Sequence, residues 1–199
     1  EGGTSTYGAN DIANQLNAAY GNQNIAAIIL RTNSGGGEVT AMQILSQTVK
    51  DRNKPVIGWA QFAASAAYGT LAPANEIIAN GELASVGSIG AVYEVDMEFL
   101  NWYKENVLAI YGTKSQNKNQ EIRALLNGDS TPIQKMVDRY TDNFHSIVTS
   151  NRPLSGNVEH TLSGAMFSAK EAKRNGLVDS IGGLNYAIKR AQAWAKISK

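Results

Sequence analysis

The sequence lacks several residue types and patterns that common functions require. It has no cysteine, which excludes disulfides, thiolate zinc sites and cysteine nucleophiles together. The formal net charge is +1 and the charges are scattered, so no field would attract nucleic acid or an anionic membrane. No apolar run approaches the roughly 20 residues that span a bilayer. We therefore expect no nucleic-acid partner and no membrane span in this chain.

The length of 199 residues suits one domain with a hydrophobic core, and we expect a single domain over residues 1–199. The first ten residues lack the basic and then apolar pattern of a signal peptide. Because the chain begins at Glu1 with a stretch rich in Gly, Ser and Thr, we also expect that a strand upstream of it is missing.

Short apolar runs alternate with helical patterns along the chain. The runs predict strands at 25–32, 55–60, 76–80 and 107–112, with strand character also in 82–95. Apolar spacing predicts helices at 10–20, 40–53, 65–74, 97–106 and 131–152, one at 169–176 capped by Gly176, and a last one from Leu184; 113–129 is either a polar loop or a short helix. This alternation predicts an α/β fold with a parallel-rich sheet and ligands near the carboxyl ends of its strands.

Ser65 lies among small apolar residues directly after the predicted strand at 55–60. A serine at such a strand-to-helix junction is placed beside unpaired backbone N–H groups, where a nucleophile is useful. One strand-helix unit earlier, the sequence NSGGGEV (33–39) joins a strand to a helix. It fits neither phosphate-binding glycine pattern, so it is either a plain connection or, with Ser65, an oxyanion hole formed by the N–H groups of Gly37 and Ala66.

A serine nucleophile needs a base, and the two histidines of the chain are poorly placed to serve as one. His145 lies beside the packed stripe of a predicted helix and His160 in a polar loop, so both fit structural roles better. A neutral lysine is the known alternative. Lys114 and Lys118, in the polar loop after residue 112, are the candidates, and either could equally be a solvated loop residue.

Three motifs in this order resemble those of the S49 peptidases, which include signal peptide peptidase A and phage capsid or prohead proteases. They are NSGGGEVTA, FAASAAYG and SVGSIGAV, and the resemblance extends from about Asn10 to Ala191. The length and the segment IYGTKSQNKNQEIRALLNGD (110–129) are most similar to the single-domain phage branch. The resemblance implies a ClpP/crotonase-like spiral fold of repeated ββα and βα units, and a Ser/Lys dyad that works without metal or cofactor.

The site residues follow from the same resemblance. Ser65 is implied as the nucleophile, and Gly37 and Ala66 as the oxyanion-hole donors. Gly36 and Ser88 fall where the family lines its substrate site, although Ser88 is equally well explained as a turn serine. The base is implied to be Lys118, with Lys114 as the alternative. The usual motif has Pro where Gly35 stands, which predicts a more flexible loop here.

The sequence thus predicts a serine-type endopeptidase of the capsid-maturation kind, which acts on a peptide or protein such as a capsid or scaffold protein. The resemblance implies a homo-oligomer in which the active site can be shared between subunits. A cytoplasmic location is expected, with membrane association only if a missing N-terminus carries an anchor. The alternatives are a signal peptide peptidase that degrades membrane-derived peptides, a crotonase-like acyl-CoA enzyme, and an inactive scaffold subunit.

Overall fold

The computed structural model describes residues 8–197, and the predicted missing upstream strand lies outside this range. Contacts divide the described chain into two compact units. Unit 1 comprises the residues up to Gly90 and those from Asn143 onward, and unit 2 comprises Ala91–Asp142. The sequence-based prediction of a single domain stays a prediction.

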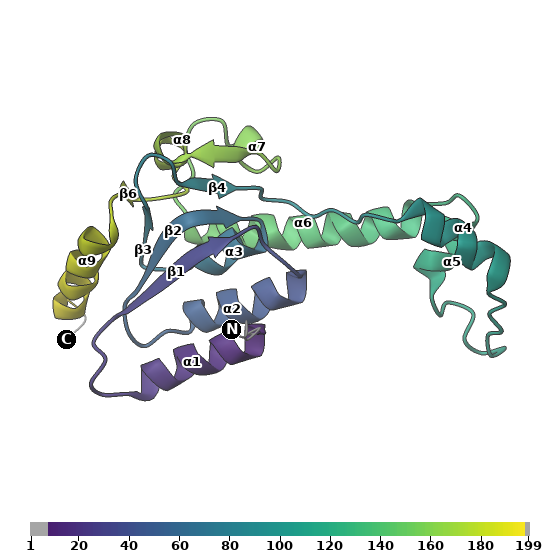
Figure 1. Cartoon of the computed structure of the whole chain (residues 1–199), viewed down its shortest axis with the longest axis horizontal. Coiled ribbons are helices and arrows are strands. Elements are labelled where there is room, and N and C mark those ends of the chain that lie inside the picture. The colour runs from purple at the N-terminus through teal and green to yellow at the C-terminus, as the bar shows by residue number, and fades with distance from the viewer. Residues whose placement is uncertain (1–7, 198–199) are drawn as a thin grey trace, which may run out of the picture. The chain divides into compact units, whose positions relative to one another are not determined.

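The order of elements alternates strands with helices through most of unit 1 (Figure 1). It begins with α1 (Ala9–Gly21), β1 (Ile28–Ser34), α2 (Val39–Lys50), β2 (Val56–Ala64), α3 (Ala66–Leu71), β3 (Glu76–Ala79) and β4 (Ser85–Gly87). Unit 2 contains α4 (Met97–Asn106), α5 (Gln120–Leu126) and the start of α6 (Thr131–Asn151). The chain returns to unit 1 along α6 and continues with α7 (Val158–Thr161), β5 (Met166–Ser168), α8 (Ala169–Arg174), β6 (Ser180–Ile181) and α9 (Leu184–Ile197).

Strand β2 is the centre of the sheet. It pairs in parallel with β1, β3 and β4, while β6 extends the sheet beyond β3 and β5 pairs antiparallel with β4. Its first five residues, VIGWA, are all buried, as expected for a parallel strand covered on both faces. The prediction of an α/β fold with a parallel-rich sheet is therefore confirmed.

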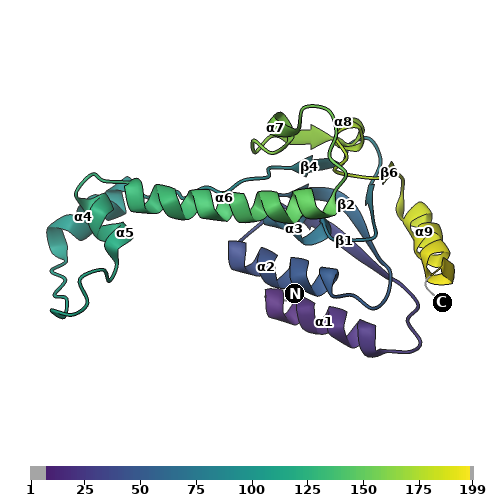
Figure 2. The same cartoon turned by 180° about the vertical axis from the view of Figure 1, so that it is seen from behind.

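Two hydrophobic clusters cover the two faces of the sheet. The larger one includes Val56 and Ala60 of β2 together with side chains of α1, α2, α3 and α6. The smaller one includes Ile57 and Trp59 of β2, which pack with Ala187 and Ala191 of α9. Figure 2 shows the helices of unit 1 around the sheet from behind. Alternate residues of β2 thus pack against the helices on both faces of the sheet, which fixes the position of the carboxyl end of the strand.

Glu76, at the start of β3, is a buried carboxylate held by the last helix. It accepts hydrogen bonds from Arg190 Nε at 2.8 and 3.0 Å and from Trp194 Nε1 at 3.0 Å. A buried charge is tolerated when it is paired and hydrogen-bonded in this way. The interaction ties α9 to the strand beside β2.

The predicted strand at 107–112 is wrong. These residues follow α4 without regular structure, and Leu108 and Ile110 are 87% and 88% exposed. A strand needs a neighbouring strand to pair with, and unit 2 contains none among its described residues. Other strands differ from their predicted bounds. Strand β1 runs from Ile28 to Ser34, β2 extends to Ala64, and only Ser85–Gly87 forms a strand within 82–95.

The helix at 169–174 ends as the sequence predicts. Gly176 has φ +80°, and its N–H donates to Lys173 O at 3.2 Å. A Cβ added at Gly176 would lie 2.1 Å from the carbonyl oxygen of Pro153, so both the backbone conformation and the space require glycine. Gly176 therefore allows the end of α8 to pack directly against Pro153, in the segment that follows α6.

We predict that Gly176→Ala destabilises unit 1 more than Gly164→Ala does. Gly164 has φ +87° but nothing within 4 Å of an added Cβ, so it carries the backbone strain without the clash. Urea-induced unfolding of both variants should show an extra loss of about 1–3 kcal/mol for Gly176→Ala. Equal losses at the two positions would contradict the close approach to Pro153.

Candidate active site

Ser65 occupies a strained turn between β2 and α3. It has φ 51° and ψ −131°, an uncommon conformation for a residue other than glycine. Its N–H donates to Gly87 O at 2.9 Å, and its carbonyl accepts from the N–H groups of Tyr68 and Gly69. The backbone is thus held on both sides while the side chain remains partly exposed. This sharp strand-to-helix turn is the geometry that presents a nucleophilic hydroxyl at the end of a sheet.

The glycine loop after β1 lies directly against this turn. Gly36 has φ +116°, and a Cβ added there would lie 2.8 Å from Ser65 Cβ, 3.1 Å from Ala64 O and 3.3 Å from Ala66 N. Only a residue without a side chain permits this approach. The structure therefore brings the glycine loop of one strand-helix unit together with Ser65 and Ala66 of the next unit.

Two backbone amides follow directly in the chain after the residues of this contact: that of Gly37 after Gly36 and that of Ala66 after Ser65. Within residues 8–197, neither the Gly37 N–H nor the Ala66 N–H donates a hydrogen bond to another protein group, and the Ser65 hydroxyl also has no such partner. Ala66 is the first residue of α3, where an N–H has no intrahelical acceptor. Free amides of this kind could stabilise the oxyanion of an acyl-transfer intermediate.

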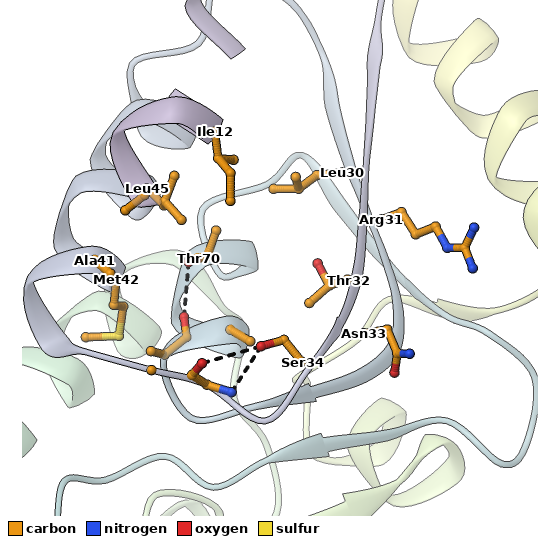
Figure 3. A pocket seen from close by; sticks show the side chains of 15 residues that line it. Ile12, Leu30, Arg31, Thr32, Asn33, Ser34, Ala41, Met42, Leu45 and Thr70 are labelled. Carbon is orange, nitrogen blue, oxygen red and sulfur yellow. Dashed lines mark hydrogen bonds between the residues drawn. The ribbon is translucent and has the colours of Figure 1, made fainter. Parts of the chain in front are cut away.

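Ser34 shapes the glycine loop and was not singled out from the sequence. Its hydroxyl accepts from the Gly36 N–H at 3.2 Å and donates to the Gly36 carbonyl at 3.4 Å, as the dashed lines of Figure 3 show. In the sequence, Ser34 could have been found as a serine directly before a run of glycines, because Ser hydroxyls commonly form hydrogen bonds with the backbone two residues later. Ser34 fixes the orientation of the peptide groups that lead into Gly37.

A pocket of about 400 Å³ opens beside the glycine loop and Ala66. Figure 3 shows Ile12 of α1, Leu30 of β1 and Leu45 of α2 around it. Met42 and Thr70 also line the pocket, and the Thr70 hydroxyl is already used in a bond to Ala66 O at 3.0 Å. A mostly apolar pocket next to two free amides could hold an apolar side chain of a ligand whose polar group faces Ser65.

Ser88 follows the strand residue that binds Ser65. Its φ is 52° and its N–H donates to Ala165 O at 2.8 Å, while the preceding Gly87 carbonyl accepts the Ser65 N–H. Ser88 therefore directly follows Gly87, whose carbonyl supports the Ser65 turn. Its role in the substrate site stays a prediction.

The histidines and Tyr68 make structural contacts. His145 places Nε2 2.8 Å from Leu162 O, and His160 packs edge-on against Phe167 with ring centroids 5.6 Å apart. Tyr68 is fully buried and donates to Leu177 O at 2.8 Å, and burial raises the pKa of its hydroxyl well above the ordinary value. Asp179 accepts from Ile77 N at 2.7 Å and pairs with Arg152, so it orders its turn.

Both candidate lysines belong to unit 2, whereas Ser65 belongs to unit 1. The side chains of Lys114 and Lys118 are exposed. Their loop is ordered by Arg123, which donates to Gln116 O at 2.6 Å and lies 4.8 Å above the ring of Tyr111. The assignment of the base therefore stays a prediction.

No group of three or more His, Asp or Glu side chains in residues 8–197 could hold a metal ion. No helix of these residues has the length and apolar character needed to cross a bilayer.

Known proteins resemble this chain in sequence over most of its length. Its sequence is 31% identical to "Putative protease MJ0651" of Methanocaldococcus jannaschii, over 93% of this chain and 61% of that protein. It is 29% identical to Protease 4 of Haemophilus influenzae, over 93% of this chain and 31% of that protein. The chain therefore spans less than two thirds of the length of these relatives.

Solved structures confirm the predicted ClpP/crotonase-like fold. A mutant of the 1510-N membrane-bound stomatin-specific protease matches with a TM-score of 0.50 at 15% identity, over 92% of this chain and 76% of that chain. An enoyl-CoA hydratase from Shewanella pealeana matches with a TM-score of 0.53 at 13% identity, over 96% of this chain and 67% of that chain. At these identities the likeness concerns the fold alone, and hydratases and proteases share it.

The family follows from the sequence rather than from the fold. The model of peptidase family S49 matches residues 48–198, a range that includes Ser65, Ala66 and both candidate lysines. The resemblance seen in the sequence motifs is confirmed by this match and by the protease relatives. The chain belongs to peptidase family S49.

Proposed function

We propose that this chain is a serine endopeptidase that hydrolyses peptide bonds through an acyl-enzyme, with Ser65 as the nucleophile. The observation that carries the proposal is the close approach of Gly36 to Ser65, since the N–H groups of Gly37 and Ala66, the next residue of each segment, have no protein acceptor among residues 8–197. Two amides and a serine at one strand end are the parts that acyl transfer requires. Membership of peptidase family S49 supports the same chemistry.

In the proposed reaction, neutral Lys118 accepts the proton of Ser65 as Oγ attacks the peptide carbonyl carbon. The N–H groups of Gly37 and Ala66 donate to the oxyanion. The C–N bond then breaks, the lysine gives its proton to the leaving amine, and an ester to Ser65 remains. Water attacks this ester with the lysine again as base, which releases the acid and restores the serine.

Lys118 must be shielded from water to act as a base, because desolvation favours the neutral form of a lysine. Its side chain is exposed in the isolated chain. We therefore propose that the active dyad is completed in an oligomer, in agreement with the shared site that the family resemblance implies.

The pocket beside the glycine loop would hold an apolar side chain of the substrate on the acyl side of the scissile bond. The peptide backbone would lie extended along the neighbouring strand ends, as in β-strand addition. Support for a capsid or scaffold protein as substrate comes only from the likeness of residues 110–129 to the phage branch. The relative named Protease 4 supports protein hydrolysis without indicating which protein is cleaved.

We predict that Ser65→Ala abolishes labelling of the chain by a fluorophosphonate probe, because the probe requires an activated hydroxyl. Ser150→Ala, which changes an exposed serine on α6, should label like the parent. In-gel fluorescence after labelling gives the comparison. Persistent labelling of Ser65→Ala would show that the nucleophile lies elsewhere.

We predict that Gly36→Ala lowers kcat for peptide cleavage by about 10²-fold, because its Cβ would push the loop and its amides away from Ser65. Gly35→Ala is the matched control. An added Cβ at Gly35 would meet only the Phe62 ring at 3.7 Å, which is an ordinary contact, and kcat should change little. Similar kinetics for the two variants would contradict the importance of the close approach.

We predict that Lys118→Ala reduces kcat by roughly 10²–10⁴-fold and that Lys114→Ala leaves it within a few-fold of the parent. Both side chains are exposed, so neither change should alter the unfolding midpoint. The rates are to be measured by peptide cleavage at a protein concentration where the parent is active. Loss of cleavage in Lys114→Ala alone would assign the base to that residue.

A further inference from the structure

Helix α3, which follows Ser65, is tied to a distant part of unit 1 by the side chain of Tyr68. The helix has six residues, Ala66–Leu71, and a helix this short is not stable by itself. The Tyr68 ring is fully buried, and its hydroxyl donates a hydrogen bond to Leu177 O at 2.8 Å, across 109 residues of sequence. This bond therefore helps to fix the position of α3.

Tyr68 is also bonded to Ser65 through its backbone. The N–H groups of Tyr68 and Gly69 donate to Ser65 O at 2.9 and 3.1 Å. Ser65 has φ 51° and ψ −131°, and such an uncommon conformation persists only where the surroundings over-determine it. Since the main chain of Tyr68 binds Ser65 and its side chain binds Leu177, a movement of Tyr68 would change the backbone of the Ser65 turn.

The acceptor of the Tyr68 hydroxyl belongs to an ordered segment. Leu177 is fully buried, and its N–H donates to a carbonyl of α8 at 2.8 Å. Two residues later, Asp179 accepts from the Ile77 N–H at 2.7 Å and forms an ion pair with Arg152 at 2.8 Å. The side chain of Arg152 is 3% exposed, so water screens this ion pair only weakly. The carbonyl that binds Tyr68 is thus held by contacts with strand β3 and with the residue after α6.

The Tyr68 hydroxyl is unsuited to transfer a proton in the proposed reaction. Burial raises the pKa of Tyr68 well above the ordinary value, so the hydroxyl stays protonated at neutral pH. Its proton is directed at Leu177 O, and Tyr68 is not among the described residues that line the pocket beside the glycine loop. Tyr68 therefore acts on Ser65 by holding the helix in place rather than by taking part in the chemistry.

We propose that the Tyr68 hydroxyl is a positioning group, which holds the first turn of α3 so that Ser65 keeps its strained conformation and the Ala66 N–H keeps its direction. The inference rests on the proposed function, in which Ser65 attacks and Ala66 donates to the oxyanion. The pocket for the substrate is lined mainly by residues of α1, β1 and α2. Loss of the hydroxyl should therefore slow the chemical step and leave substrate binding nearly unchanged.

The test compares Tyr68→Phe with Tyr20→Phe, both shown to be folded by urea unfolding. Tyr20 is 9% exposed and donates to Thr48 O at 3.2 Å, so each variant loses a hydrogen bond from a largely buried hydroxyl to a backbone carbonyl. We expect Tyr68→Phe to lower kcat for peptide cleavage by about 10-fold, with KM within about twofold of the parent, because small displacements of reacting groups slow the chemical step. Tyr20→Phe should keep the parent kcat. An unchanged kcat in Tyr68→Phe, equal losses in the two variants, or a change in KM alone would overturn the proposal.

Amide hydrogen exchange, measured by NMR, gives a readout that does not depend on catalysis. In Tyr68→Phe, the amides of residues 68 and 69, which donate to Ser65 O, should exchange about 5-fold faster relative to those of α9. In Tyr20→Phe they should exchange as in the parent, and parent rates in Tyr68→Phe would overturn the proposal. A parent that neither cleaves peptides nor reacts with the fluorophosphonate probe would contradict the proposed function instead, and the exchange rates would still show whether Tyr68 holds the turn.

Asp179→Asn keeps the test decisive if Tyr68→Phe does not fold. It removes the charge that pairs with Arg152 and retains an oxygen that accepts the Ile77 N–H, while the Tyr68 ring is not altered. Because this change loosens the segment that contains Leu177, it should speed exchange at the amides of residues 68 and 69 and lower kcat without a change in KM. Unchanged exchange and kcat in folded Asp179→Asn would refute the connection between this segment and the Ser65 turn.

Discussion

The candidate site depends on one close contact between two backbone segments at the end of the central strand. The peptide of Gly36 lies so near Ser65 that a single added carbon would meet its Cβ at 2.8 Å. This contact needs β1 and β2 in register side by side, because each strand delivers one of the two partners. The pairing of β1 with β2 shifts between Thr32 and Asn33, just before the glycine loop begins. The candidate site therefore depends on the pairing of β1 with β2.

Burial decides which parts of this fold the sequence could predict. The strands at 55–60 and 76–80 are buried on both faces, so their short apolar runs indicated them correctly. The run at 107–112 looks alike in sequence, but its side chains face solvent and no strand pairs with it. A sequence window contains the apolar residues but not the partner surface that would make them a strand.

The same reasoning explains what was predictable about the site. Ser65, Gly37 and Ala66 could be selected as candidates because a serine after a strand and a run of glycines are local patterns that the sequence contains. Ser34 was missed because its bond to Gly36 N is one of several contacts that such a serine could make. The lysine could not be assigned, because its function depends on surroundings that no local pattern of residues around Lys114 or Lys118 specifies.

The pairing of Glu76 with α9 has a consequence for how the chain folds during synthesis. Its partners Arg190 and Trp194 follow it by 114 and 118 residues. Until they emerge from the ribosome, the carboxylate at the start of β3 must stay hydrated, since a buried charge without a partner is strongly unfavourable. Strand β3 can therefore enter the sheet in its final form only after Arg190 and Trp194 have been translated, and the nascent chain exposes one edge of β2 until then.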